Sequence, residues 1–329
     1  MYMGVDVHKN YCQFHVLDDN GKIFSKAKVV NTPDSLTKYV QGLPNESKQA
    51  VLEAGYGWMP VHDTLSGLGV SVCLAHPKKT KAIADARIKT DKIDAQALAE
   101  LLYQNYVPKV WIPDQQTRRL RELTRHRMLL VHNCTRLKNN IHNYLSRIGV
   151  QAPRLANLFT KPGIKFLQGI ALDEQQRFLL DSKISSLLAT KQQVKIVTER
   201  IQETGTQDKR VTTLTKIQGI GLFGALVIVS EIGDIERFEH PKKLCSWAGM
   251  VPSVSQSGNK TVYGHITKHG NAYLRWILVQ CTHASIRYPG YLQSRYYKIM
   301  HKRGSKAATI ACARKLLTKI WYELKRAKQ

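Results

Sequence analysis

The chain has 329 residues, 43% of them hydrophobic, which is enough for two or three globular domains and argues against a disordered chain. Its 50 lysines and arginines outnumber its 24 acidic residues and give a formal net charge of +26. This charge predicts a polyanionic partner, most commonly nucleic acid, and a membrane-surface protein is disfavoured because the sequence carries no amphipathic anchor or lipidation signal.

Three short strands are expected at the start of the chain, over Tyr2 to Val7, Tyr11 to Leu17 and Ile23 to Val30. The second strand alternates, with Cys12, Phe14 and Val16 on one face. Asn20-Gly21 predicts a tight turn before the third strand, because this pair tolerates the positive φ that such turns require. The strands are therefore expected to pair antiparallel.

An alternation of helices and strands follows. Thr32-Pro33 opens a helix with a capping residue and a proline at the first helical position. Further strands are predicted at Gln49 to Glu53 and Val70 to Leu74, and further helices at Met59 to Leu68 and, after another helical stretch, Asp91 to Tyr103. Three antiparallel strands followed by this alternation are typical of a ribonuclease H-like α/β fold, which we expect for a catalytic domain over residues 1–107.

A domain boundary is predicted at Pro108 and Pro113, and two long amphipathic helices follow it. The first is roughly 30 residues long and the second runs from about Glu174 to Glu203. Their apolar stripes are Leu120, Leu123, Leu130, Leu137, Ile141, Leu145 and Ile148, and Leu180, Ile184, Leu187, Val194 and Ile201. Such helices pair with each other or with another copy, so residues 108–207 are expected to form a coiled-coil region for oligomerisation. A turn or loop is expected at Lys161-Pro162-Gly163, and residues 208–329 form a third, mainly helical region.

Four acidic residues stand where carboxylates are costly. Asp6 lies in the middle of an apolar strand, and Glu53 ends another. Asp91 and Asp94 lie three residues apart and so share one helix face. Converging carboxylates repel each other unless cations lie between them, and hard oxygen ligands select Mg²⁺ or Mn²⁺. The four residues are therefore predicted to hold metal ions that act on a phosphate.

Simpler interpretations exist for the single acids. Asp91 directly follows Thr90 and would also suit the first turn of a helix, where the helix dipole favours an acid. Glu53, before Ala54-Gly55, would suit an ordinary strand end. Asp6 is harder to explain in this way, because burying an unpaired carboxylate is costly. The four acids together favour the metal site.

A glycine-rich turn, Lys216-Ile217-Gln218-Gly219-Ile220-Gly221, precedes an apolar helix that starts at Leu222. The pattern resembles a helix–hairpin–helix motif, in which backbone amides at Gly219 and Gly221 would meet a phosphate at a helix N-terminus. The alternative is a plain glycine turn between two core helices.

The stretch from Ala248 to Arg275 is rich in small and polar residues. A serine in its glycine-bounded loop could act as a nucleophile, with Lys268 and Arg275 as phosphate clamps. Residue chemistry alone leaves three serines open as that nucleophile: Ser253, Ser255 and Ser257. Two histidines four residues apart, His265 and His269, are expected to face solvent or phosphate, since no third metal ligand is nearby in the sequence.

Two segments are strongly basic. Residues 114–150 hold eight lysines or arginines and two acids, and residues 290–329 hold eleven and one. This imbalance predicts a polyanion-binding surface, with Arg118, Arg119 and Arg125 as candidate nucleic-acid contacts. Several aromatic residues in the last segment could stack on bases, although core packing is the simpler role for each: Tyr291, Tyr296, Tyr297, Trp321 and Tyr322.

A cytoplasmic, nucleoid-associated protein is expected, with no membrane partner. The longest apolar run, Leu222 to Val229, is too short to cross a bilayer. Asp6, His8 and Lys9 would not occur in a secretory signal. The six cysteines have no paired spacing, which argues against a zinc ribbon and fits reduced thiols.

Three acidic motifs resemble those of the DEDD insertion-sequence transposases. They are Gly4-Val5-Asp6-Val7-His8-Lys9, Leu52-Glu53-Ala54-Gly55-Tyr56 and Lys89-Thr90-Asp91-Lys92-Ile93-Asp94-Ala95. The glycine turn at Gly219 to Gly221 and the block from Ala248 to Arg275 are similar to the C-terminal transposase domain of the same family. The resemblance covers nearly the whole chain in the expected order.

The resemblance implies a RuvC-like N-terminal domain and a recombinase that is guided by a bridge RNA paired with target and donor DNA. In this family the catalytic serine belongs to a Ser-Gly pair shortly after an Ala-Gly-x-x-Pro motif, and this selects Ser257. Family members assemble as dimers and tetramers, for which the long central helices are suited.

The main hypothesis is therefore a transposase that cuts and rejoins DNA with a metal-binding acid quartet and a serine nucleophile. One alternative is a Holliday-junction-type nuclease of the same fold that uses water as its nucleophile. Another is a nucleic-acid-binding scaffold without catalysis, which is disfavoured because clustered carboxylates facing phosphates would only weaken binding.

Overall fold

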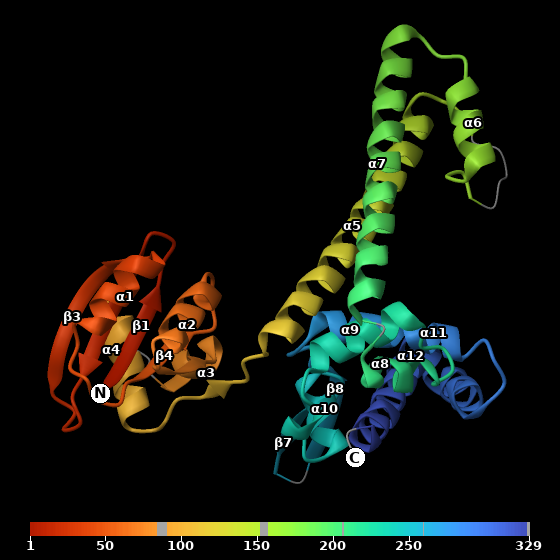
Figure 1. Ribbon diagram of the computed structural model, residues 1–329. Helices are drawn as coiled ribbons and strands as arrows, with labels where there is room; N and C mark the ends of the chain where they lie inside the picture. The colour runs from red at the N-terminus through yellow and green to blue at the C-terminus, as the bar shows by residue number, and fades with distance from the viewer. Residues whose placement is uncertain (84–90, 152–156, 206, 259, 328–329) are drawn as a thin grey trace. The chain divides into compact units, whose positions relative to one another are not determined.

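A computed structural model describes residues 1–83, 91–151, 157–205, 207–258 and 260–327. The chain divides into two compact units, Met1–Ile112 and Pro113–Gln329. The first unit is mixed α/β and the second is mostly helical (Figure 1). None of the described helices is long and apolar enough to cross a membrane. The expected division of the chain into three parts, with a boundary at residue 207, stays a prediction.

A six-stranded sheet forms the centre of the first unit, in the order β3-β2-β1-β4-β5-β6. Its strands are β1 (Tyr2–Val7), β2 (Tyr11–Leu17), β3 (Ile23–Val30), β4 (Gln49–Glu53), β5 (Ser71–Ala75) and β6 (Lys109–Val110). The first three strands pair antiparallel, β4 and β5 run parallel to β1, and β6 is antiparallel to β5. The five strands expected from the sequence are confirmed to within a residue. The two-residue β6 is an addition, because it is too short to show any period.

The described residues of this unit form four helices beside the sheet: α1 (Pro33–Gln41), α2 (Trp58–Gly67), α3 (Pro77–Ile83) and α4 (Asp91–Tyr103). The predicted start of α1 is confirmed, because the Thr32 side chain accepts a hydrogen bond from the Ser35 amide and Pro33 occupies the first turn. The residue before α4, Thr90, lies outside the described residues.

Helices cover both faces of this sheet. Leu36 of α1 and Leu65 of α2 pack in one core with Met3, Val5 and Phe14. On the opposite face α4 packs against β1 and β2, so β2 is buried on both sides. The alternation in β2 identified only one of these two buried faces, because the other carries the polar residues Gln13 and His15.

Gly4 allows α4 to lie directly on β1. A Cβ atom at this position would collide with the backbone of Ala95 and Ala99 in α4. The helix is therefore held against the strand at backbone distance. This close approach fixes where the first turn of α4 lies relative to Asp6, two residues after Gly4 on the same face of the strand.

The second unit begins with the two long helices that the sequence predicted, α5 (Gln115–Arg147) and α7 (Glu174–Gly205). They pack side by side and share an apolar core that includes Ile141, Leu145, Leu180 and Leu187 (Figure 1). The loop expected at Lys161-Pro162-Gly163 is wrong, because these residues start helix α6 (Lys161–Gly169). Proline is favoured in a first helical turn, so Pro162 marks a helix start here.

The rest of the unit surrounds the buried helix α9 (Leu222–Ile232), nearly all of whose residues are in the core. The elements around it are α8 (Lys209–Thr215), the 3₁₀ turn η1 (Ile235–Arg237), α10 (Pro241–Trp247), the strands β7 (Pro252–Ser257) and β8 (Lys260–Ile266), α11 (Ala272–Ser285) and α12 (Tyr291–Arg326). Helix α12 kinks at Gly304, where φ is 79°. The stretch expected to be a loop around Ser257 is instead a two-stranded hairpin.

Candidate active site

Asp6 and Glu53 lie on neighbouring parallel strands. Val5 of β1 pairs with Leu52 of β4, and the two acids follow these residues by one position each. Residues in register on parallel strands point to the same face, so both carboxylates lie on one side of the sheet. That side also carries Gly4, and it is the side covered by α4.

The first turn of α4 brings two more acids to this position. Asp91 lies one helical turn before Ala95, whose backbone rests on Gly4, and Asp94 directly precedes Ala95. Both carboxylates are close enough to Asp6 to raise the pKa of its carboxyl electrostatically. The structure thus brings Asp6, Asp91 and Asp94 together, with Glu53 at the end of the adjacent strand.

His8 and Tyr11 belong to this cluster and were not assigned a role from the sequence. His8 Nε2 lies 3.0 Å from Asp6 Oδ2 and 3.4 Å from Asp91 Oδ1. The Tyr11 hydroxyl donates a hydrogen bond of 2.7 Å to Asp91 Oδ2, and its ring stacks on His8 at 4.6 Å between ring centres. The available signal was the spacing of His8, two residues after Asp6. The link to Asp91 spans 80 residues and leaves no local pattern.

The electrostatics of the site suit a cation. Burial raises the pKa of the Asp6 carboxyl, His8 opposes this shift, and the charges of Asp91 and Asp94 add to it. The hydrogen bond from Tyr11 lowers the pKa of Asp91 and keeps that carboxylate charged. One ligand atom each from Asp6, His8 and Asp91 lie within 4.8 Å of one another. Two carboxylates and an imidazole at this separation can share one metal ion.

The candidate serines lie in the second unit, in strand β7. Ser253, Ser255 and Ser257 alternate along the strand and are all exposed. Ser257 is the last residue of β7 and pairs with Lys260 across the hairpin. The structure gives all three hydroxyls access to solvent, so their exposure does not choose among them.

Lys268 and Arg275, the two predicted phosphate clamps, differ in exposure and in hydrogen bonding. Lys268 is exposed and has a positive φ of 54°. Arg275 is partly buried and donates a hydrogen bond of 3.0 Å to the Ala248 carbonyl. One side of its guanidinium therefore holds the end of α10. His265 and His269 are both exposed and belong to no metal-ligand group among the described residues.

Gly219 has a structural reason to be glycine. Its φ is 89°, and a Cβ atom there would collide with Ser285 of α11. Ser285 Oγ donates a hydrogen bond of 2.7 Å to the Gln218 carbonyl, which fixes the turn against that helix. Gly221 caps the N-terminus of α9 and is exposed. The phosphate contacts expected at both glycines stay predictions.

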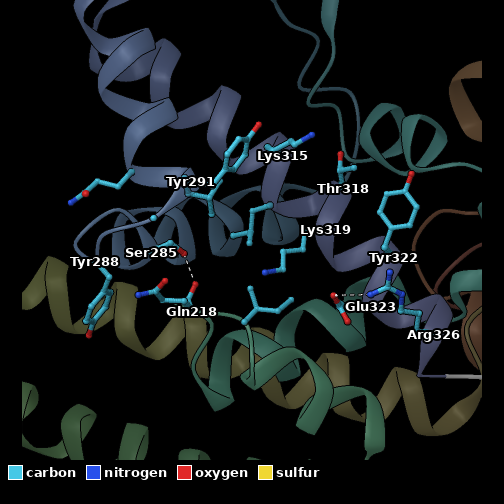
Figure 2. A pocket seen from close by; sticks show the side chains of 15 residues that line it. Gln218, Ser285, Tyr288, Tyr291, Lys315, Thr318, Lys319, Tyr322, Glu323 and Arg326 are labelled. Carbon is cyan, nitrogen blue, oxygen red and sulfur yellow. Dashed lines mark hydrogen bonds and ion pairs between the residues drawn. The ribbon is translucent and has the colours of Figure 1, made fainter.

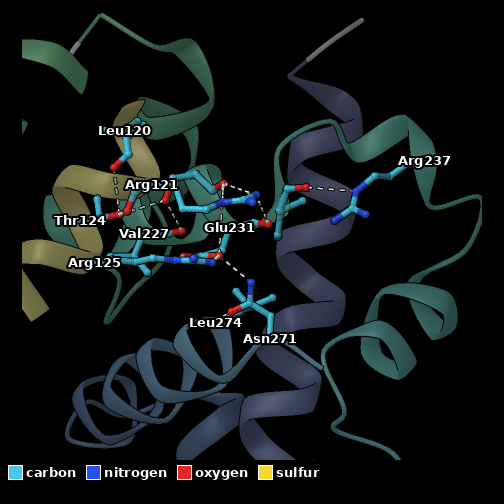
Figure 3. A network of polar contacts seen from close by, with 11 residues as sticks. Leu120, Arg121, Thr124, Arg125, Val227, Glu231, Arg237, Asn271 and Leu274 are labelled. Atoms are coloured by element: carbon cyan, nitrogen blue, oxygen red, sulfur yellow. Dashed lines mark hydrogen bonds and ion pairs between the residues drawn. The ribbon is translucent and has the colours of Figure 1, made fainter. Parts of the chain in front are cut away.

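Arg125 is partly exposed and binds a buried carboxylate (Figure 3). Its Nε and Nη2 atoms donate to the two oxygens of Glu231 at 2.7 and 2.8 Å, and the Glu231 side chain is fully buried. Asn271, the N-cap residue of α11, donates to the same carboxylate at 2.6 Å, and Arg121 donates to the Ser230 and Glu231 carbonyls. This network gives Arg125 a structural partner, and the nucleic-acid contact expected of its partly exposed side chain stays a prediction. Arg119 is exposed, and Arg118 is half-buried.

Two transposase family models match this chain, one in its N-terminal half and one in its C-terminal half. A transposase model of the DEDD type matches residues 3–150, and the model described as Transposase IS116/IS110/IS902 family matches residues 211–298. The transposase for insertion sequence element IS1111A of Coxiella burnetii is 27% identical, over 98% of this chain and 89% of that protein. The transposase for insertion sequence element IS1328 of Yersinia enterocolitica is 24% identical, over 97% of this chain and 95% of that protein.

Proposed function

The chain belongs to the IS116/IS110/IS902 family of insertion-sequence transposases, enzymes that cut and rejoin DNA, and we propose that Asp6, Glu53, Asp91 and Asp94 form its cutting centre. The observation that carries this proposal is the docking of α4 on β1 at Gly4. That contact places two acids of one helix beside an acid of the central strand. A divalent metal centre is the chemistry that this arrangement suits.

The strand order supports a ribonuclease H-like, RuvC-like fold for the first unit. Three antiparallel strands are followed by two strands parallel to the first, and helices cover both faces. The acids sit in β1, at the end of β4 and in the first turn of α4, so a phosphate would meet them at one place on the sheet.

We propose Mg²⁺ or Mn²⁺ as the metal, held by the four carboxylates. When bound, it would polarise the scissile phosphate and stabilise the leaving oxygen. Tyr11 orients Asp91 through its hydrogen bond, and His8 contacts both Asp6 and Asp91. His8 is therefore either a further ligand or the group that positions the two acids.

Ser257 is proposed as the nucleophile, and this rests on its place in a Ser-Gly pair after Ala248-Gly249 and Pro252. Its position at the end of β7 leaves the hydroxyl accessible to a DNA strand. Attack of its Oγ on phosphorus would form a serine–DNA phosphodiester and break the bond to the deoxyribose oxygen, which leaves as a hydroxyl with the proton that serine loses. This exchange conserves the energy of the phosphodiester bond for rejoining. Lys268 is exposed and suited to hold the phosphate, whereas Arg275 is partly committed to Ala248.

The partners that we propose are target and donor DNA, a bridge RNA, and further copies of the chain in a dimer or tetramer. The net charge of +26 supports binding of nucleic acid. Base pairing with a guide RNA would set the target sequence without base-reading side chains in the protein. The RNA is supported by the family resemblance, and the assembly by the long helices α5 and α7.

A covalent-trapping experiment tests the proposal. The full-length protein, with any RNA that copurifies, is incubated with labelled DNA that carries the ends of its element and with Mg²⁺, and denaturing gels resolve protein–DNA adducts and cut strands. We expect Ser257→Ala to abolish the adduct and Asp6→Asn to abolish cutting. Ser253→Ala, Ser255→Ala and the exposed-acid control Asp34→Asn should behave like the parent.

Other outcomes would select a different enzyme or none. Cutting without an adduct, unchanged in Ser257→Ala, would indicate a junction nuclease that uses water. Cutting or adduct formation that survives in Asp6→Asn would contradict the metal centre. If the parent protein binds DNA but neither cuts it nor forms an adduct, the result would favour the nucleic-acid-binding scaffold without catalysis.

A further inference from the structure

A cavity of about 530 Å³ lies between the glycine turn after α8, the α11–α12 connection and the second half of α12 (Figure 2). Three tyrosine rings line it and are about half exposed: Tyr288 at 54%, Tyr291 at 60% and Tyr322 at 49%. Aromatic rings that gather around a cavity instead of entering the core mark a binding surface.

Cations line the same cavity. Lys315, Lys319, Tyr322 and Arg326 follow one another at intervals of three or four residues, and therefore share one face of α12. Within the described part of the chain neither Lys315 nor Lys319 forms an ion pair, whereas Arg326 Nη1 lies 3.7 Å from Glu323 Oε1. Two lysines one helical turn apart repel each other, so an anion between them would be stabilised.

On one side of the cavity, a hydrogen bond fixes the backbone of the glycine turn. Ser285, a buried residue of α11, donates its hydroxyl to the Gln218 carbonyl at 2.7 Å, and the left-handed Gly219 lets the turn lie against it. The Gln218 side chain lines the cavity from this fixed backbone (Figure 2). Its amide offers both a hydrogen-bond donor and an acceptor, as the edge of a nucleic-acid base requires.

We infer that this cavity binds an unpaired nucleotide of a single-stranded nucleic acid. The base stacks on Tyr291 or Tyr322 and meets the Gln218 amide, while Lys315 and Lys319 hold its phosphate. Stacked bases inside a duplex cannot enter a cavity, so an intact duplex is not the ligand. The inference rests on the proposed function only for the presence of nucleic acid. The strand is either RNA or DNA whose strands are separated at a cutting site, since both present an unpaired base next to a phosphate.

Fluorescence anisotropy on the full-length protein tests this inference. The probes are an oligothymidylate and an oligouridylate of about eight nucleotides and a duplex DNA, measured in EDTA so that no cutting occurs. We expect Tyr291→Ala and Tyr322→Ala to weaken binding of a single strand by about tenfold and to leave duplex binding unchanged. Tyr322→Phe should retain affinity, because the ring is kept, and the exposed tyrosine control Tyr106→Ala should match the parent.

The lysines have their own matched control. Lys315→Gln/Lys319→Gln should weaken single-strand binding more than Lys242→Gln/Lys243→Gln, which removes the same charge from exposed positions of α10. If these variants lose affinity for both the thymidylate and the uridylate probe, the site accepts either kind of strand. If they lose affinity for the uridylate probe alone, the site is assigned to RNA. Equal effects on duplex and single strand, or no effect of either tyrosine variant, would overturn the inference. Because EDTA removes the metal that the proposed cutting centre needs, this binding measurement does not depend on that centre, and the two proposals fail separately.

Discussion

His8 lies between two of the proposed metal ligands, at 3.0 Å from Asp6 and 3.4 Å from Asp91. We expect His8→Gln to weaken Mn²⁺ binding by about 10- to 100-fold, because groups that ligate a metal or orient its ligands contribute affinities of this size. Titration calorimetry of the full-length protein measures the change. The exposed histidine variant His132→Gln is the control, and an unchanged affinity in His8→Gln would remove His8 from the metal site.

Cys281 gives a second prediction at the scale of one residue. Burial raises the pKa of its thiol from 9.0 to about 11. Because only the thiolate reacts, and its share at pH 8 falls about a hundredfold, iodoacetamide should label Cys281 about a hundred times more slowly in the folded protein than in urea. Peptide mass spectrometry after timed labelling reads the rate. Rapid labelling of the native protein would show that α11 opens readily.

At the scale of elements, the contact between β1 and α4 brings together the acids of the proposed metal centre. We expect Gly4→Ala to lower the free energy of unfolding by about 1 to 3 kcal/mol, because the added methyl group collides with the backbone of α4. Urea unfolding measures the loss, and Mn²⁺ binding should weaken with it as Asp91 and Asp94 shift. Gly67→Ala in α2 is the control, since its added Cβ meets no atom within 4 Å. Equal stability of the two variants would contradict the close contact.

The carboxylate of Glu231 joins three helices, because from its own position in α9 it binds Arg125 of α5 and Asn271, the N-cap residue of α11. We expect Glu231→Gln to destabilise the second unit by about 3 to 5 kcal/mol, since the arginine charge would stay partly buried without its partner. Urea unfolding is again the measurement. The exposed Glu239→Gln variant should unfold like the parent, and a Glu231→Gln protein that does the same would make the network dispensable.

The sequence predicted elements well where local patterns are strong. Asn20-Gly21, Thr32-Pro33 and the apolar stripes of α5 and α7 correspond to a turn, a helix start and two paired helices. The pattern Lys161-Pro162-Gly163 predicts a loop but starts α6 instead, because proline is favoured both in loops and in a first helical turn. The roles of Tyr11 and Arg125 could not be predicted, because their partners Asp91 and Glu231 lie 80 and 106 residues away. Contacts of that separation depend on packing, not on local spacing.

At the scale of the whole molecule, the net charge of +26 is expected to govern affinity for DNA. Contacts with six to ten phosphates would reduce duplex affinity by about 10³- to 10⁵-fold between 50 and 200 mM salt, because each contact releases counterions. Anisotropy titrations across this range measure the slope. An affinity that hardly changes with salt would contradict a binding surface built on lysine and arginine.

The docking of α4 also has a consequence for the newly made chain. Asp6 belongs to the first strand to be synthesised, but Asp91 and Asp94 belong to a helix that follows all five longer strands of the sheet. In a nascent chain the proposed metal centre is therefore incomplete until α4 has left the ribosome and packed against Gly4. If these acids form the cutting centre, the competence to cut DNA is acquired late in the folding of the first unit.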